Sequence, residues 1–226
     1  MDSVVKSAVH TALQLKERQR AERAEYSEAF GLRIHRAISW LQRAEQAEMD
    51  EDMDGRFIFL WISFNSAYSN DLSGVSITET EQFQRFLSRL VDRDTHHLLY
   101  DLTWGKYPSA VRVLLDNPYV YQPFWNHRNQ IKGFENWEQR FRQSKQAAHT
   151  ALAQKDTAKV LSIIFGRLYT LRNQIIHGGA TYASSANRSQ LRDATAILGD
   201  LVPALIEIMM DNSQAHWGDA CYPLVD

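Results

Sequence analysis

Residues 172–179 read RNQIIHGG and place an arginine, an amide and a histidine just before two glycines. The guanidinium of Arg172 offers a fork of N–H donors that suits the oxygens of a phosphodiester. The imidazole of His177 is a group that takes up and releases a proton near neutral pH. Cleavage of RNA without a metal needs a base that activates the ribose 2′-OH and a cation that stabilises the transition state. The residue types therefore indicate phosphate chemistry at this position.

A helix is expected to carry these residues. Asp156 and Thr157 form an N-terminal cap, and the two glycines at 178–179 end the helix. Between them, a stripe of apolar residues predicts one buried face: Val160, Ile164, Leu168, Leu171 and Ile175.

The helix places Asn173 and His177 on one polar face, because residues four apart are neighbours on a helix surface. Arg172 and His177 are five apart, or roughly 140° around the helix, so they cannot form a rigid pair. The long stem of the arginine still lets its guanidinium swing toward the histidine. The alternative is that Arg172 and His177 only cap the helix end, where basic side chains hydrogen-bond the last carbonyls.

Residues 171–178 resemble the R-x4-6-H motif of HEPN domains, with a polar residue after the arginine. Upstream, residues 32–41 and 57–68 resemble the first core helices of Apea-like HEPN proteins. Downstream, residues 192–212 resemble the last helix of these proteins. The likeness covers roughly residues 28 to 217, and the histidine motif together with the helix 57–68 makes it more specific than the motif alone.

The resemblance implies an all-α protein, an up-and-down helical bundle of the HEPN type with additional peripheral helices. It also implies a homodimer in which the motifs of two subunits meet at a cleft. Such proteins are often metal-independent endoribonucleases in toxin–antitoxin or antiphage defence systems, so an antitoxin or a defence complex is an expected partner. In that role Arg172 would hold the scissile phosphate, His177 would move the proton, and Asn173 would orient the histidine or contact the RNA. Some HEPN relatives are catalytically silent, and the alternative is a non-catalytic nucleotide-binding or protein-interaction module, such as a regulatory subunit.

The charge of the chain is unevenly placed. The net charge is −2, yet residues 126–192 hold eleven Lys or Arg against three Asp or Glu, a local charge of +8. A polyanion such as RNA would be attracted to this region, although a solvated basic helix face is the alternative. The candidate RNA-binding residues are Arg128 and Lys132, which alternate with aromatic residues, and Arg188 and Arg192, which follow His177 after a short loop.

The aromatic residues between Tyr119 and Phe141 allow two interpretations. Mixed with Arg128 and Lys132, they would form a stacking platform for single-stranded RNA. Packed on each other, they would form a small satellite core.

Helical patterns extend along nearly the whole chain, and no β-alternation of useful length occurs. We expect one domain over residues 1–226, in which residues 1–27 form a peripheral N-terminal helix or arm and residues 69–80 form a loop. The expected helices lie at about 28–47, 57–68, 81–92, 95–104, 108–115 and 188–211.

Other features limit the classes of protein. The single cysteine, Cys221, permits no internal disulfide and builds no zinc site, which is compatible with the cytoplasm. No signal peptide is recognisable, and the longest apolar run, residues 57–64, is too short to cross a bilayer, so we expect no membrane partner. Residues 50–55 match the opening of a calcium-binding loop, but Trp61 stands where the bidentate glutamate belongs. We therefore predict neither a metal site nor a cofactor.

Overall fold

The computed structural model describes residues 9–68, 79–185 and 187–218, and this part of the chain is helical without a β-strand. The all-α prediction is confirmed, as the described helices pack against one another in a bundle. In chain order the elements are α1 (Ala12–Glu22), η1 (Arg23–Glu25), α2 (Glu28–Met49), α3 (Met53–Tyr68), α4 (Glu79–Val91), α5 (Leu98–Tyr100), η2 (Asp101–Lys106), α6 (Pro108–Asp116), η3 (Pro118–Val120), α7 (Gln122–Arg128), α8 (Trp137–Ala153), α9 (Thr157–Ile176) and α10 (Arg188–Asp211).

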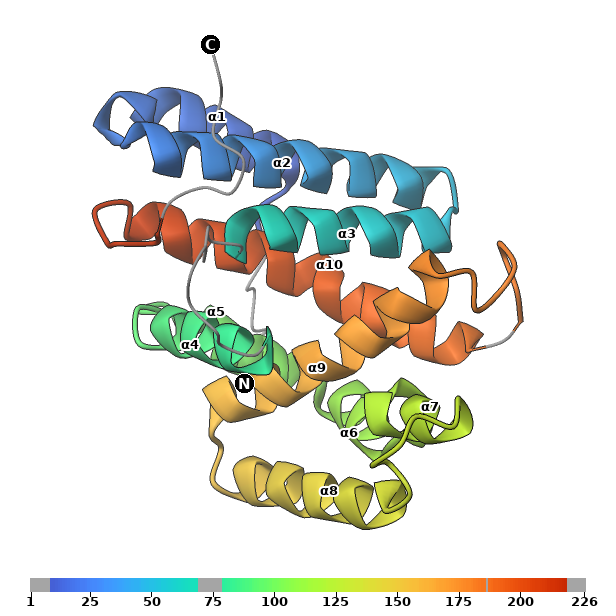
Figure 1. Cartoon of the computed structure of the whole chain (residues 1–226). Coiled ribbons are helices and arrows are strands. Elements are labelled where there is room, and N and C mark those ends of the chain that lie inside the picture. The colour runs from blue at the N-terminus through green and yellow to red at the C-terminus, as the bar shows by residue number, and fades with distance from the viewer. Residues whose placement is uncertain (1–8, 69–78, 186, 219–226) are drawn as a thin grey trace, which may run out of the picture.

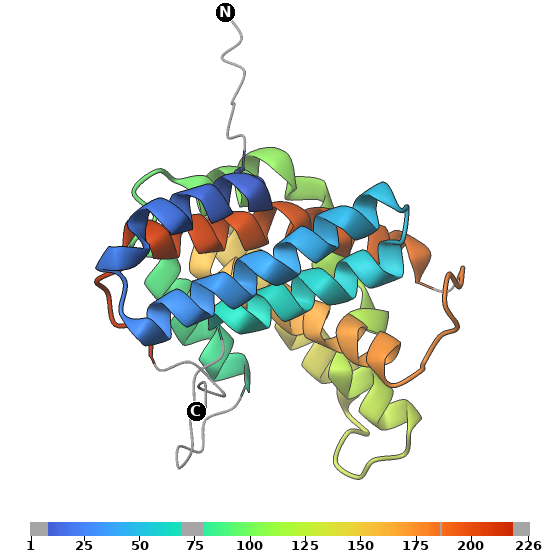
Figure 2. The same ribbon diagram turned by 90° about the horizontal axis from the view of Figure 1, so that it is seen from above.

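Four helices make one half of the bundle. α2 and α3 form an antiparallel hairpin, α10 packs against both, and α1 packs against α2 and α10 (Figures 1 and 2). α10 begins and ends where the sequence pattern placed it and keeps Pro203 inside it, while α2 runs two residues beyond its predicted end.

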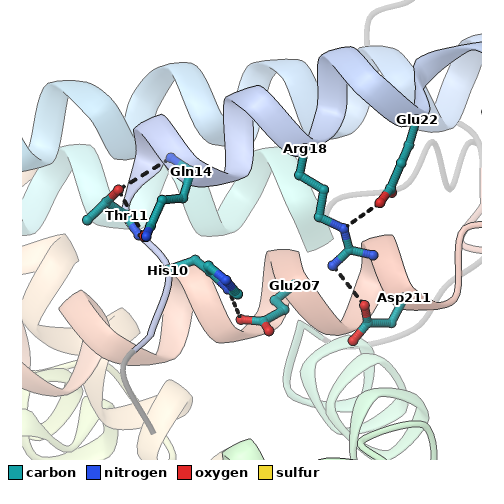
Figure 3. A network of polar contacts seen from close by, with 7 residues as sticks. All are labelled: His10, Thr11, Gln14, Arg18, Glu22, Glu207 and Asp211. Carbon is teal, nitrogen blue, oxygen red and sulfur yellow. Dashed lines mark hydrogen bonds and ion pairs between the residues drawn. The ribbon is translucent and has the colours of Figure 1, made fainter. Parts of the chain in front are cut away.

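The N-terminal segment, expected as a peripheral helix or arm, contains α1, which is tied to the body of the protein. Leu15 of α1 is fully buried in the core. Polar contacts add to this docking, since His10 Nδ1 lies 2.7 Å from a carboxylate oxygen of Glu207, and Arg18 Nη1 lies 2.7 Å from Asp211 (Figure 3). Residues 1–8 lie outside the described part of the chain.

α9 joins the two halves of the molecule. It contacts α3 and α4 on one side and α6, α8 and η3 on the other, with α8 forming the outer layer (Figure 1). Its midpoint is fixed in an aromatic core, where the ring of Phe165 lies 4.3 Å from that of Phe64 and 6.1 Å from that of Phe83. The predicted apolar stripe is the buried face of α9, with Ile175 only partly buried at its end.

Three local predictions need correction. α3 begins at Met53 rather than at Phe57, because Asp52 Oδ1 accepts the N–H of Gly55 at 2.9 Å and caps the helix. The helix expected at 95–104 is the single turn α5 followed by the π-helical segment η2. The loop expected at 69–80 falls outside the described residues except for Glu79 and Thr80, which begin α4.

The aromatic residues of the segment 119–141 pack on one another in η3, α7 and the start of α8. The ring of Phe124 lies 5.0 Å from that of Trp137, and the ring of Tyr121 lies 5.2 Å from that of Phe141. Arg167 of α9 is buried against them, with its guanidinium 4.4 Å from the Tyr121 ring. The satellite core therefore exists, and Tyr119 at its edge is half exposed.

No helix in the described part of the chain is both long and apolar enough to cross a bilayer.

Candidate active site

The candidate active site lies at the C-terminal end of α9, where two glycines stop the helix. Asp156 caps the other end by accepting the Lys159 N–H at 2.9 Å, as the sequence predicted. At the C-terminus, Gly178 has φ +70°, a left-handed conformation that favours glycine. The N–H of Gly179 then donates to the carbonyl of Gln174 at 2.7 Å and that of Gly178 to Ile175 at 3.1 Å, which forms a Schellman motif.

This helix end presents His177 to solvent. His177 is the C-cap residue, and its backbone N–H donates to the carbonyl of Asn173 at 3.0 Å. Its imidazole is exposed and makes no hydrogen bond or ion pair with any described residue. The ring is therefore free to approach a substrate, and no described group holds it in one orientation.

Arg172 lies half-buried next to the helix face that carries Asn173 and His177. Its Nη1 donates to Oδ1 of Asn173 at 2.9 Å, and its guanidinium carbon lies 6.0 Å from the centre of the Tyr169 ring. Its Nε is buried and has no hydrogen-bond partner among the described residues. Because Asn173 and His177 share one face, the bond to Asn173 holds the guanidinium toward that face of the helix.

Asn173 makes a contact that the sequence did not predict. The sequence left two roles open, orienting His177 or contacting RNA. The side-chain oxygen of Asn173 accepts from Arg172, so this residue positions the arginine. Its amide nitrogen makes no hydrogen bond within the described chain and remains able to donate to a ligand.

Sequence reasoning missed Gln174, which links three segments at this helix end. Its Nε2 donates to the carbonyl of Tyr119 in η3 at 2.7 Å. Its Oε1 accepts from Nδ2 of Asn187, the residue before α10, at 2.9 Å. Both partners are distant in sequence, so only the position of Gln174 next to Asn173 could have drawn attention to it.

The four candidate RNA-binding residues fall into two groups. Arg128 at the end of α7 and Lys132 just after it are exposed and form no ion pair with a described residue. Arg188, in contrast, makes a close ion pair with Asp54 of α3. Its guanidinium is therefore engaged in holding α10 to α3, although Asn187 next to it does contact the end of α9.

Arg192 points to another part of the surface. It lies 3.5 Å from Asp193 and lines a pocket of about 250 Å³ between α2, α3 and α10. Glu48, Glu51 and Asp52 line the same pocket together with Arg56, so Arg192 shares it with three acidic side chains and a second arginine. Arg192 would therefore attract an anionic ligand at His177 less strongly than its position shortly after His177 in the sequence suggested.

Among the described residues, no three His, Cys, Asp or Glu side chains gather closely enough to hold a metal ion.

Comparison of the chain with protein-family models, with characterised proteins and with solved structures finds no match. The assignment to HEPN proteins therefore stays a prediction from the motif and the helix pattern.

Proposed function

We propose that the protein is a metal-independent endoribonuclease of the HEPN type, acting as a homodimer in toxin–antitoxin or antiphage defence. The observation that carries this proposal is the hydrogen bond from Arg172 to Asn173, which directs a cation toward the face that bears the exposed imidazole of His177. A cation and a titratable ring on one exposed helix end are the groups that 2′-OH attack requires.

The proposed reaction uses His177 as the proton carrier. The imidazole accepts the proton of the ribose 2′-OH, and the 2′-oxygen attacks phosphorus while the bond to the 5′-oxygen breaks. The leaving oxygen takes a proton from the imidazolium or from solvent. The products are a 2′,3′-cyclic phosphate and a 5′-hydroxyl, and Arg172 stabilises the charge on the non-bridging oxygens during the step.

The second candidate is a non-catalytic nucleotide-binding module. It is favoured by one observation, namely that no described side chain orients the imidazole of His177. A binding module would still use the guanidinium of Arg172 and the free amide of Asn173 to hold a phosphate or a base.

Cleavage of a synthetic RNA in excess EDTA distinguishes the endoribonuclease from the non-catalytic module. Wild-type protein cuts the RNA and His177→Ala does not, while His96→Ala, which removes an exposed histidine elsewhere, leaves the rate unchanged. Binding of the RNA without cleavage by wild type supports the non-catalytic module. Equal cleavage by wild type and His177→Ala contradicts the role of the histidine.

A further inference from the structure

Tyr119 presents an exposed ring from a rigid backbone. Half of the residue is exposed to solvent, at 50%. Its carbonyl accepts from Nε2 of Gln174 and from Nε1 of Trp125, each at 2.7 Å, and its N–H donates to Oδ1 of Asn117 at 2.8 Å. Three hydrogen bonds therefore hold the backbone of a side chain that extends into solvent.

The ring of Tyr119 is also supported from one side. Its centre lies 5.4 Å from that of Phe124, with the two planes at 86°. Phe124 in turn packs edge-to-face against Trp125 and Trp137. The satellite core thus limits the motion of the Tyr119 ring, and this lowers the entropy lost when a flat ligand binds to it.

The segment that carries Tyr119 docks on one side of His177, opposite Arg172. Successive residues of a helix advance by about 100°, so Arg172, Asn173, His177 and Gln174 follow one another in this order around the end of α9. Gln174 makes the hydrogen bond to Tyr119. The position of His177 on the helix therefore falls between Arg172 and Gln174, whose amide binds the carbonyl of Tyr119 in η3.

A nucleotide has the same order of parts. With its ribose at His177 and its phosphate toward Arg172, its base extends toward the opposite flank. α7, which packs beside η3, ends with the exposed Arg128, and Lys132 follows. These cations have no ion pair with a described residue, and they would attract the phosphates of a strand that continues past Tyr119.

We propose that the ring of Tyr119 stacks a nucleobase next to the linkage held at His177, so that the substrate is single-stranded RNA. A base inside a duplex has neighbours stacked on both faces, and a base in a loop or a single strand has a face free for an aromatic side chain. Gln174 acts as a positioning residue, because its amide sets the place of the Tyr119 backbone. The inference rests on the proposed function and adds the class of RNA and the residue that selects it.

The test compares the binding of an intact short single-stranded RNA with the binding of a series of the same RNA, each member of which lacks the base at one position. All proteins carry His177→Ala, so that no RNA is cut. Adding Tyr119→Ala weakens binding of the intact RNA by about five- to 150-fold, the range of base–aromatic stacking, and leaves binding of one abasic RNA unchanged. Tyr119→Phe keeps the affinity, because the stacking face is retained.

Two further variants sharpen the cycle. Gln174→Glu removes the donor to the Tyr119 carbonyl and reduces the difference between the intact and abasic RNAs, without abolishing binding. Tyr100→Ala, which removes an exposed tyrosine on α5, leaves the affinities for both RNAs unchanged.

An equal loss of affinity for intact and abasic RNA in Tyr119→Ala overturns the stacking proposal, as does the absence of any loss or of any RNA binding. The nuclease proposal is tested by a separate measurement, and it is wrong if the wild-type protein does not cleave RNA. If wild type cleaves RNA but Tyr119→Ala changes the affinities for intact and abasic RNA equally, only the stacking proposal is wrong.

Discussion

At the scale of single residues, Arg172 occupies a costly position. Its Nε is buried without a hydrogen-bond partner among the described residues, and only Asn173 accepts from its Nη1. Leaving a buried donor unsatisfied costs about 1–3 kcal/mol, and the Nε atoms of the core residues Arg33 and Arg167 are unpartnered in the same way. A phosphate at this helix end would offer the guanidinium the acceptors that it lacks.

Replacement of Arg172 separates its role in turnover from its role in folding. Arg172→Ala should lower the rate of RNA cleavage by about 10²- to 10³-fold, the usual effect of losing a transition-state donor. Arg172→Lys keeps the charge but loses the fork, so it should recover only part of the rate. The rates are measured in single-turnover assays and the folding by the melting temperature.

The matched control for these variants is Arg112→Ala, which removes an exposed arginine on α6 and should cleave RNA like wild type. A fall in the melting temperature of Arg172→Ala that accounts for the lost activity would show that the arginine is structural.

The sequence located Arg172, Asn173 and His177 at a helix end, because the cap, the apolar stripe and the glycines are local signals. It did not reveal that Asn173 binds Arg172, since two roles for the amide were compatible with the same spacing. Nor did it reveal the link from Gln174 to Tyr119, which joins residues 55 positions apart. Contacts of that range depend on how η3 and α9 pack, and no periodicity encodes them.

At the scale of elements, two glycines, Gly166 inside α9 and Gly178 just after its end, should respond oppositely to alanine. Gly178 has φ +70°, so Gly178→Ala should lower the free energy of unfolding by about 1–2 kcal/mol. Gly166 lies inside the helix, and a Cβ there would meet nothing within 4 Å. Gly166→Ala should therefore raise the free energy of unfolding by about 0.5–1 kcal/mol.

Urea denaturation of both glycine variants measures these changes. The Gly178 variant should also cleave RNA more slowly, because a loosened helix end no longer fixes His177. If both variants shift stability in the same direction, the Schellman motif does not hold the end of α9.

The contact between α1 and α10 gives a prediction on pH. Glu22 accepts from Arg18 Nε at 2.7 Å, while Arg18 also contacts Asp211 (Figure 3). The Tyr26 hydroxyl donates a second hydrogen bond to Glu22 at 2.6 Å. Burial opposes ionisation of Glu22, but the hydrogen bonds from Arg18 and Tyr26 outweigh it and lower the pKa of Glu22. A carboxylate with a lowered pKa adds stability above its ordinary pKa, and this is lost as the pH falls through the pKa of the folded state.

Glu22→Gln should thus destabilise the protein at pH 7, by less than about 1 kcal/mol because the pair with Arg18 is partly exposed. The difference from wild type should shrink as the pH falls below the ordinary carboxyl pKa of about 4.3, and vanish once the pH is below the lowered pKa of the folded state, where Glu22 binds a proton in both states. Urea unfolding at the two pH values measures it, with Glu17→Gln as a control on the exposed side of α1. A difference that grows on acidification would contradict the assigned shift.

Element boundaries were predictable where capping residues mark them. The ends of α9 were predicted from such signals, and α10 from its helical pattern after a short polar loop, although its first turn has no side-chain cap. The start of α3 was not predicted, because the acidic residues before it read as a loop. There Asp52 is itself the cap. The π-helical turn η2 has no sequence signal among the patterns used, since apolar spacing of a short segment fits several kinds of helix equally well.

At the scale of the whole molecule, the basic segment 126–192 is partly neutralised by acids from outside it. Arg188 pairs with Asp54, and Lys145 lies 2.9 Å from Asp116. The local charge counted along the sequence therefore exceeds the positive charge that is free to meet RNA. Arg128 and Lys132 remain as the exposed cations on the Tyr119 side of the site.

The oligomeric state is a prediction at the same scale. Size-exclusion chromatography with light scattering should give twice the mass of the 26.1-kDa chain, and cleavage should fall when dilution separates the subunits. The exposed Ile176, next to His177, is an apolar side chain that a second copy would cover. A monomer that cleaves RNA at an undiminished rate would contradict a site shared by two subunits.

The chemical ends of the RNA fragments test the central claim most directly. Mass spectrometry of the products should find a 2′,3′-cyclic phosphate on one fragment and a 5′-hydroxyl on the other, and a 2′-deoxy substitution at the cut site should block cleavage. Fragments with a 3′-hydroxyl and a 5′-phosphate, or cleavage of the 2′-deoxy linkage, would contradict proton transfer from the 2′-OH to His177.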